Sequence, residues 1–253
     1  MIGDMKVLCL IPVRMGSHRF PGKPLAKING KTMVQTIYDN TQNSKYIDNY
    51  FIITEDEIIK KEVLKFTSNV LLTDKHSDCI IRSVEGLDII ETNKNKSFDY
   101  IVIVQGDEPL VTTVMVDKAI EELYNNSEFE NWCDLVNVCS SLSDFDVHNL
   151  NAVKVFSEND KMIACLYGRR VAVPKLQRYK QTGIFVLRRE ILKNYRWLSP
   201  TFFEEILNID MLRFLENKYK IKLCYINKYL PSVDVPSDID IIEKEIKCLS
   251  GKF

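Results

Sequence analysis

The chain has 253 residues, of which 45% are hydrophobic and 27% are charged. This length allows one large α/β domain with a full core, or two small domains. The 34 Lys and Arg residues balance 35 Asp and Glu residues, so the formal net charge at pH 7 is −1. The balance excludes the overall basic field on which non-specific nucleic-acid binding depends, and an anionic ligand must therefore be met by local charge.

The seven cysteines predict a protein with reduced thiols. They form no C-x-x-C pair and most lie in apolar runs, which is typical of core thiols rather than of a disulfide framework or zinc site. The N-terminal sequence lacks the basic and long apolar regions of a signal peptide, and no apolar run approaches the roughly 18 to 20 residues of a membrane span. We expect a soluble cytoplasmic protein without membrane or nucleic-acid partners.

Short apolar runs alternate with amphipathic stretches in the first half of the chain. The predicted strands are 6–12, 50–54, 69–73 and 99–105, and the predicted helices are 31–42, 57–66, 82–92 and 113–123. Strands without polar alternation that take turns with helices predict a mainly parallel sheet covered on both faces. This part of the chain therefore predicts a doubly wound α/β fold.

The rhythm changes after about residue 132, where apolar runs follow one another with few helical stretches between them. The predicted elements are strands at 134–142, 151–157 and 162–167, a strand then a helix in 183–199, a helix at 200–217, a strand at 220–227 and a helix at 236–249. Closely spaced strands predict an antiparallel lobe that extends the sheet. One compact domain over residues 1–253 is the simplest interpretation.

The stretch "IPVRMGSHRFPGKPL", Ile11–Leu25, directly follows the first predicted strand. In an open α/β sheet it lies at the carboxyl edge, where ligands bind. Backbone amides and basic side chains there suit a nucleoside triphosphate, and the residues concerned are Arg14, Gly16, Ser17, Arg19, Gly22 and Lys23. Pro24 stands where a Walker A sequence needs Ser or Thr. The alternative interpretation is a solvated basic turn.

Two other strands end in carboxylates. The uncharged run in "IVIVQGDEPLV", Ile101–Val111, stops at Asp107 and Glu108. A carboxylate at this edge, facing the basic loop, is what a Mg²⁺ ion shared with substrate phosphates needs. Asp234 in "SVDVPSDIDII" follows a strand in the same way, although it could instead cap the helix after it.

The three stretches together resemble the CMP-Kdo synthetases, cytidylyltransferases that join CTP to 3-deoxy-manno-octulosonate (Kdo). The frames "IPxRxxSxRxPGKPL", "VQGDEP" and "VDxPxD" are intact and in order, and "NAVKV" and "GIF" lie between them. The resemblance implies a single Rossmann-like nucleotide-diphospho-sugar transferase domain and a homodimer. It also implies a nucleotide-binding part at about residues 1–130 and an acceptor and dimerisation lobe at about 131–230.

In the reaction that the resemblance implies, the 2-hydroxyl of a keto-sugar acid attacks the α-phosphorus of CTP and pyrophosphate leaves. The implied nucleotide-binding residues are Arg14, Gly16, Ser17, Arg19, Lys23, His76 and Gln105, and the implied catalytic residues are Arg14, Lys23 and Asp107. The implied acceptor-binding residues are Arg82, Gln105, Gln181, Phe185 and Asp210. Asp107 and Asp234 are the implied ligands of the cofactor, Mg²⁺.

The chain departs from this family near the acceptor. Where the family typically reads "DHQSGTER", residues 75–82 read "KHSDCIIR", so His76 and Arg82 match but the residues between them differ. "KQTGIF" likewise replaces "KHLGIY". The apolar replacements are Cys79, Ile80, Ile81 and Phe185. Either they line a pocket for a less hydroxylated or modified sugar acid, or they pack beneath the pocket.

The sequence therefore predicts a Mg²⁺-dependent cytidylyltransferase that activates Kdo or a related sugar acid for surface-polysaccharide assembly. A nucleotidyltransferase acting on a sugar 1-phosphate is the nearer alternative, and Arg169 and Arg170 in "LYGRR" keep it open. A nucleotide-binding module without turnover is less favoured because Arg14, Lys23 and both metal-site carboxylates are present.

Overall fold

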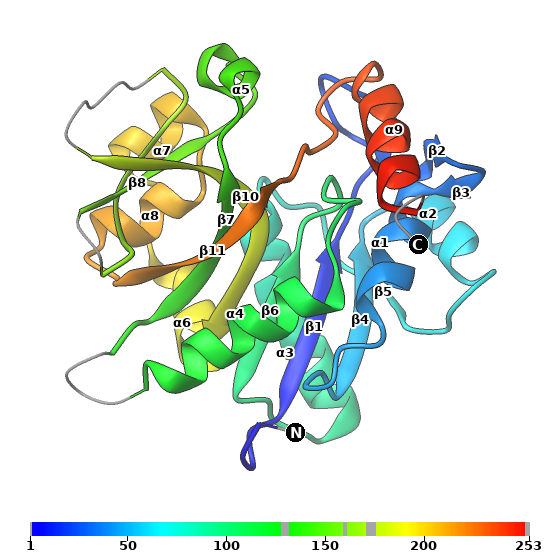
Figure 1. Cartoon of the computed structure of the whole chain (residues 1–253). Coiled ribbons are helices and arrows are strands. Elements are labelled where there is room, and N and C mark those ends of the chain that lie inside the picture. The colour runs from blue at the N-terminus through cyan, green and yellow to red at the C-terminus, as the bar shows by residue number, and fades with distance from the viewer. Residues whose placement is uncertain (1, 128–131, 159–160, 171–175, 251–253) are drawn as a thin grey trace.

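The sheet that organises the fold starts from the apolar strands of the first half of the chain. In this computed structural model, which describes residues 2–127, 132–158, 161–170 and 176–250, these are β1 (Val7–Pro12), β4 (Asn49–Thr54), β5 (Val70–Leu72) and β6 (Tyr100–Val104). They lie side by side in the order β5-β4-β1-β6, and every pairing among them is parallel (Figure 1).

Helices cover both faces of this sheet, which explains why its strands lack polar alternation. One face packs against α1 (Met33–Thr41), α2 (Glu57–Val63), α4 (Thr113–Asn125) and α9 (Asp238–Ser250). The other packs against α3 (Cys79–Lys94), α6 (Arg189–Asn194) and α8 (Met211–Glu216). Along β1, Cys9 points into the first core and Leu10 into the second.

The second half of the chain extends the sheet with mixed and antiparallel pairings. Its strands are β7 (Leu135–Ser141), β8 (Lys154–Glu158), β9 (Ile163–Gly168), β10 (Gln177–Arg188) and β11 (Ile221–Tyr229). They continue the order as β10-β7-β11-β9-β8, and β8 also pairs with β10, so the last five strands close on themselves. The predicted mixed sheet is confirmed: the strands of the first half of the chain pair in parallel, and antiparallel pairings predominate in the lobe that extends them.

The helix predicted over residues 200–217 is wrong as a single element. The chain forms α7 (Phe202–Leu207), where Glu204 accepts a hydrogen bond from the backbone amide of Thr201, and then the separate helix α8. Asn208 ends α7 in the left-handed conformation with φ 51°, which asparagine tolerates better than most residues. The break matters for function because Asn208 and Asp210 both line the main cavity.

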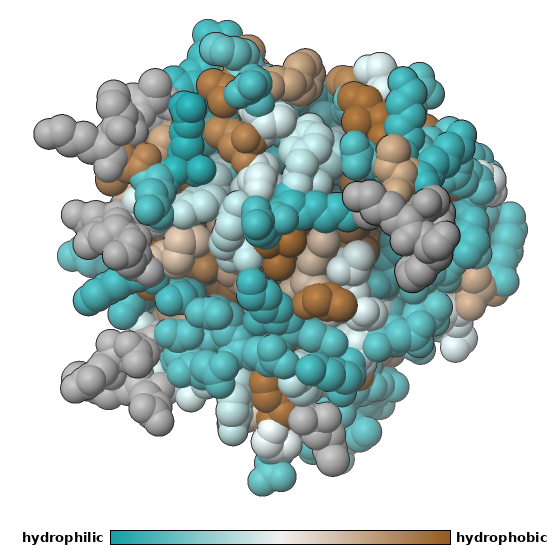
Figure 2. Space-filling view, viewed as in Figure 1, coloured by the Kyte–Doolittle hydropathy of each residue, from teal (hydrophilic) through white to brown (hydrophobic). Residues whose placement is uncertain are grey.

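The described surface carries both hydrophobic and hydrophilic side chains. Figure 2 shows hydrophobic side chains in small groups among hydrophilic ones on one face. Within the described ranges, none of the helices has the length and apolar character needed to cross a bilayer. None of the seven cysteines, all of which lie in the described ranges, forms a disulfide.

Candidate active site

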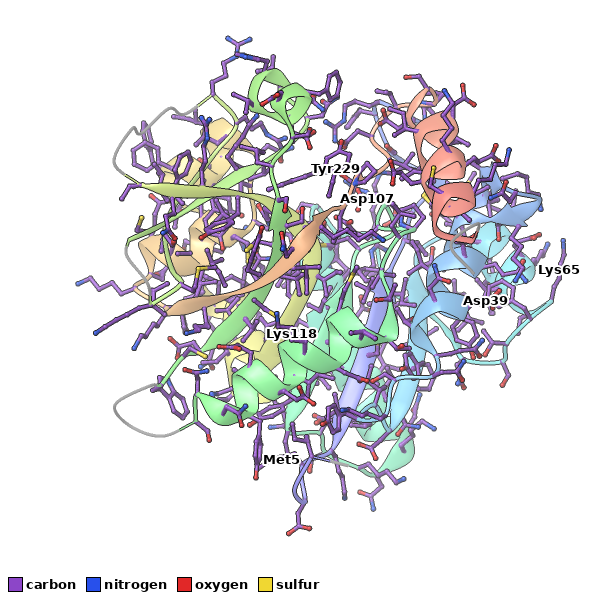
Figure 3. All side chains as sticks on the ribbon, in the orientation of Figure 1. Met5, Asp39, Lys65, Asp107, Lys118 and Tyr229 are labelled. Carbon is purple, nitrogen blue, oxygen red and sulfur yellow. The ribbon has the colours of Figure 1, made fainter. Side chains whose placement is uncertain are left out.

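The chain leaves β1 and β6 at the same edge of the sheet, because these strands are parallel neighbours. In Figure 3, Asp107 lies just beyond this edge and Met5 lies at the opposite end. A side chain at Gly106 would bring its Cβ within 2.5 Å of Val13 Cγ1, so glycine allows the two loops to approach closely. Between these loops and the second half of the chain lies a cavity of about 590 Å³.

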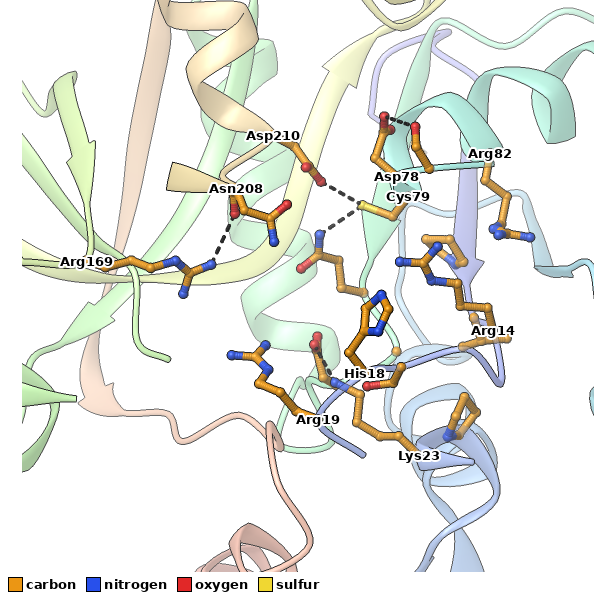
Figure 4. Close-up of a pocket in the computed structure, with 18 of the residues that line it drawn as sticks. Arg14, His18, Arg19, Lys23, Asp78, Cys79, Arg82, Arg169, Asn208 and Asp210 are labelled. Carbon is orange, nitrogen blue, oxygen red and sulfur yellow. Dashed lines mark hydrogen bonds and ion pairs between the residues drawn. The ribbon is translucent and has the colours of Figure 1, made fainter. Parts of the chain in front are cut away.

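The cavity collects most of the predicted site residues from distant parts of the sequence. Those that line it are Arg14, Ser17, Arg19, Lys23, Arg82, Gln105, Asp107 and Asp210. Figure 4 shows the basic side chains of the β1 loop at one end, and Asp78, Cys79, Asn208 and Asp210 at the other. The cavity thus has a cationic end suited to phosphates and a polar, partly acidic end.

The loop after β1 is held by backbone contacts at Met15. The amide of Met15 donates to Asp56 Oδ2 at 2.8 Å, and its carbonyl accepts from the amides of Ser17 and Gly22. Gly22 has φ 77°, a left-handed conformation that favours glycine, and it begins the 3₁₀ turn Lys23–Leu25. Gly16 is exposed, and a Cβ at this position would meet no atom within 4 Å. The loop therefore leaves open space for a ligand beside its backbone.

Two basic residues of the loop are paired with the two carboxylates predicted to bind metal. Lys23 Nζ lies 2.9 Å from Asp107 Oδ2 and also donates to the carbonyl of Val233. Arg19 lies 2.6 Å from Asp234 Oδ1 and also donates to Asn151 Oδ1. The "VDxPxD" and "NAVKV" stretches are thus brought to the phosphate loop by direct contacts.

The donor set suits Mg²⁺ shared with a substrate, rather than a metal held by protein alone. Among the described residues, no group of three or more His, Cys, Asp or Glu side chains is placed to hold a metal ion. Burial and then the charge of Asp107 raise the pKa of Asp234, while Arg19 and Lys23 lower it. The charge of Asp107 therefore acts on Asp234. In proteins, Mg²⁺ is usually bound by one or two carboxylates together with substrate phosphate oxygens.

Glu108, next to Asp107, points away from the cavity into the protein. Its side chain is buried, and Oε1 accepts a hydrogen bond of 2.6 Å from the amide of Gly183. Burial and then the charge of Asp107 raise its pKa to about 8. Glu108 therefore ties the end of β6 to β10.

His76 contributes to the site through its backbone. Arg14 donates to the carbonyl of His76 at 3.2 Å, and the His76 ring contacts Glu85 at 2.5 Å. The predicted role of the ring in nucleotide binding stays a prediction.

Arg82 lines the cavity but is almost fully buried, with 2% of its side chain exposed. It donates to Glu55 at 2.7 Å and to Thr73 at 3.2 Å. Burial alone would raise the pKa of Glu55, but the hydrogen bond and charge of Arg82 outweigh it and lower the pKa. The guanidinium is therefore already committed to a carboxylate of the protein.

The far end of the cavity carries three polar side chains in contact. Gln105 Nε2 donates to Cys79 Sγ at 2.9 Å, and this thiol donates to Asp210 Oδ2 at 3.4 Å. Asp78 caps α3 by accepting from the amide of Ile81, and its other oxygen lies 3.7 Å from Arg213. Burial and then the charge of Asp78 raise the pKa of Asp210 to about 6.

A sequence profile of cytidylyltransferases matches residues 8–221. The chain belongs to the cytidylyltransferase family. It is 31% identical over 257 residues to a 3-deoxy-manno-octulosonate cytidylyltransferase of Chlamydia pneumoniae, covering 99% of this chain and 98% of that protein. It is also 31% identical over 254 residues to an 8-amino-3,8-dideoxy-manno-octulosonate cytidylyltransferase of Shewanella pealeana, covering 96% of this chain and 99% of that protein.

A solved structure confirms the family fold for this cytidylyltransferase. The structure of a CMP:2-keto-3-deoxy-manno-octonic acid synthetase complexed with CTP matches with a TM-score of 0.83 and 25% identity. The match covers 96% of this chain and 99% of that chain. The predicted family and the predicted single α/β nucleotidyltransferase domain are both confirmed, whereas the division near residue 130 stays a prediction.

Not every residue that the resemblance assigned to the acceptor reaches the cavity of this cytidylyltransferase. Phe185 is 1% exposed and Ile80 is fully buried, and both pack in the core beneath the cavity. Ile81 packs against the same core. Gln181 lies in β10 opposite Cys139, and its Oε1 is buried without a hydrogen-bond partner among the described residues. Of the four apolar replacements, Cys79 is the one that lines the cavity.

The structure adds Asn208 to the cavity wall and places Arg169 there as well. The left-handed asparagine in "NID" is a helix-ending signal that could have located Asn208. Arg169 donates to the carbonyls of Leu150, Asn151, Leu207 and Asn208. Its guanidinium therefore holds the backbone of the cavity wall together.

Proposed function

We propose that this cytidylyltransferase transfers CMP from CTP to a 2-keto-3-deoxy sugar acid of the Kdo type. The 2-hydroxyl oxygen of the acid forms a bond to the α-phosphorus, the bond from that phosphorus to pyrophosphate breaks, and the hydroxyl proton passes to the solvent. The observation that carries the proposal is one cavity that holds a phosphate loop at one end and Gln105 and Asp210 at the other. The names of both relatives support it.

The basic residues of the β1 loop would bind and orient the triphosphate. Phosphoryl transfer depends mainly on positioning and on neutralising charge around the reacting phosphorus. Arg14, Arg19 and Lys23 supply this charge from the cavity wall. Arg19 and Lys23 would exchange their present carboxylate partners for phosphate oxygens when CTP binds.

We propose Mg²⁺ as the cofactor, with Asp107 and Asp234 as its protein ligands. When bound, Mg²⁺ neutralises phosphate charge and orients the oxygens. The two carboxylates suit this role because each already pairs with a positively charged side chain, Arg19 or Lys23. Each would then exchange a basic side chain for the metal.

The acceptor end fits a polyhydroxylated or amino-substituted sugar acid. A carboxylate accepts hydrogen bonds from hydroxyl and ammonium groups alike, so Asp210 can serve either. Kdo is the first acceptor to test, and the name of the Shewanella relative makes an 8-amino form the second. A sugar 1-phosphate is less favoured, because Arg169, one of the two arginines that keep this alternative open, already donates to four carbonyls.

The product would be an activated donor for a glycosyltransferase in surface-polysaccharide assembly. We also propose a homodimer, which sedimentation equilibrium would test against a monomer of 29.4 kDa.

Phosphorus NMR tests the reaction directly. With CTP, Kdo and Mg²⁺, we expect the triphosphate signals to be replaced by one phosphodiester signal and by pyrophosphate. Omission of Mg²⁺ tests the cofactor separately. Hydrolysis of CTP to CMP without a phosphodiester product would contradict the transfer.

A further inference from the structure

Three side chains at the acceptor end form a continuous hydrogen-bonded chain. Gln105 follows β6, Cys79 begins α3, and Asp210 precedes α8. The amide of Gln105 donates to the thiol, and the thiol donates to the carboxylate of Asp210. Figure 4 shows the thiol of Cys79 directed at Asp210. The thiol is therefore the link between two residues that come from distant parts of the fold.

Gln105 is also fixed from its other side by β10. Its backbone amide donates to the carbonyl of Gly183 at 2.8 Å. A Cβ on Gly183 would lie 2.5 Å from Gln105 Oε1 and 2.7 Å from Gln105 Cβ, so the side chain packs directly on the glycine backbone. With the strand behind it, the terminal amide is oriented by its contact with Cys79.

The thiol of Cys79 is protonated, as a hydrogen bond from it to Asp210 requires. Burial and then the charges of Asp210 and Asp78 raise the pKa of Cys79 well above its usual value, so the thiol is protonated at neutral pH. A protonated thiol can donate to Asp210 while it accepts from Gln105. It is a poor nucleophile, because the thiolate is the reactive form. The contacts thus indicate a role in geometry rather than in covalent chemistry.

We propose that Cys79 is a positioning residue for acceptor recognition, which holds the Gln105 amide and the Asp210 carboxylate in register for the polar groups of the sugar acid. This inference rests on the proposed function. Figure 4 shows Cys79 at the opposite end of the cavity from Arg19 and Lys23, so its contribution falls mainly on acceptor binding.

Steady-state kinetics of Cys79→Ala and Cys79→Ser test the proposal, with Cys165→Ala as a control at an exposed thiol. Loss of two modest hydrogen bonds predicts a rise in acceptor KM of about tenfold in Cys79→Ala. The KM for CTP and the melting temperature should stay near the wild-type values. Serine can donate and accept in place of the thiol, so Cys79→Ser should recover most of the loss. Equal rises in both KM values, or no change in acceptor KM, would overturn the proposal.

A second measurement does not depend on turnover. In amide-selective NMR spectra without substrate, Cys79→Ala should shift the side-chain NH₂ signals of Gln105, which Gln105→Asn identifies by their loss. Unchanged signals would overturn the positioning role even if the acceptor proved to be different. Absence of any wild-type product with sugar acids would instead contradict the proposed function.

Discussion

The ammonium of Lys23 lies 2.9 Å from the carboxylate of Asp107, so a cation assigned to the triphosphate and an anion assigned to Mg²⁺ neutralise each other. Arg19 and Asp234 repeat this arrangement at 2.6 Å. Each pairing thereby neutralises charge in a partly buried place. When Mg²⁺ and CTP bind together, the metal replaces the basic partners of the two carboxylates, and the phosphates replace the carboxylate partners of Lys23 and Arg19. Each ligand is therefore predicted to promote the binding of the other.

Replacement of Asp107 tests the metal site. Asp107→Asn keeps the shape but removes the negative charge, so we expect kcat to fall by about 100-fold or more. Asp234→Asn should likewise lower kcat. Pyrophosphate release gives the rate and circular dichroism checks the fold. Near-normal turnover in either variant would remove that residue from the metal site.

Removal of a basic side chain from the loop should weaken CTP binding more when that side chain is more deeply buried. Lys23 has 12% of its side chain exposed and Arg19 has 45%, so solvent screens the charge of Arg19 more strongly. Lys23→Ala should weaken CTP binding by about 2 to 5 kcal/mol, and Arg19→Ala by less. Titration calorimetry measures both, with exposed Lys27→Ala as a control of equal charge. Equal losses in all three variants would indicate a general charge effect and contradict a specific phosphate site.

The buried ion pair of Arg82 with Glu55 should stabilise the folded protein. Removal of one partner from a buried ion pair leaves the other charge uncompensated, so Arg82→Ala should lower the free energy of unfolding by about 3 to 5 kcal/mol. Glu55→Ala should destabilise at least as much, because it leaves the more deeply buried charge, the guanidinium of Arg82, with the neutral acceptor Thr73. Urea titration provides the values, with exposed Arg178→Ala as the control. Wild-type stability combined with a large rise in acceptor KM would instead identify Arg82 as an acceptor ligand.

Asp210 should make stability depend on pH. Its pKa in the folded chain is raised from 3.8 to about 6, so the folded state favours the protonated form. The associated stability is present below pH 3.8 and is lost as the pH rises through about 6. Asp210→Asn stays neutral, so relative to wild type it should gain about 1 to 3 kcal/mol between pH 4 and pH 7. A difference independent of pH would contradict the raised pKa, and exposed Asp4→Asn is the control.

The phosphate end of the site could be predicted from local sequence, because each contributing residue lies in a loop that follows an apolar strand. The parallel order of β1 and β6 then brings Arg14, Lys23 and Asp107 together without further information. The direct ion pairs of Lys23 with Asp107 and of Arg19 with Asp234 could not be predicted. The paired residues are 84 and 215 positions apart in the sequence.

The acceptor end was harder to predict because it depends on exact helix boundaries. The first turn of α3 begins at Cys79, so helical geometry turns Ile80 into the core and leaves the thiol at the cavity. The break at Asn208 divides one amphipathic pattern into two helices and places Asp210 at the cavity wall. Hydrophobic periodicity is continuous across such a break and does not reveal it.

Pyrophosphate release over a matrix of four nucleoside triphosphates and a panel of sugar acids and sugar 1-phosphates tests the central claim most directly. We predict rapid Mg²⁺-dependent release with CTP and a 2-keto-3-deoxy sugar acid, and little with the other triphosphates or with sugar 1-phosphates. Comparison of Kdo with its 8-amino and deoxy analogues then identifies the preferred acceptor. Preference for a sugar 1-phosphate, or for another triphosphate over CTP, would contradict the proposed function.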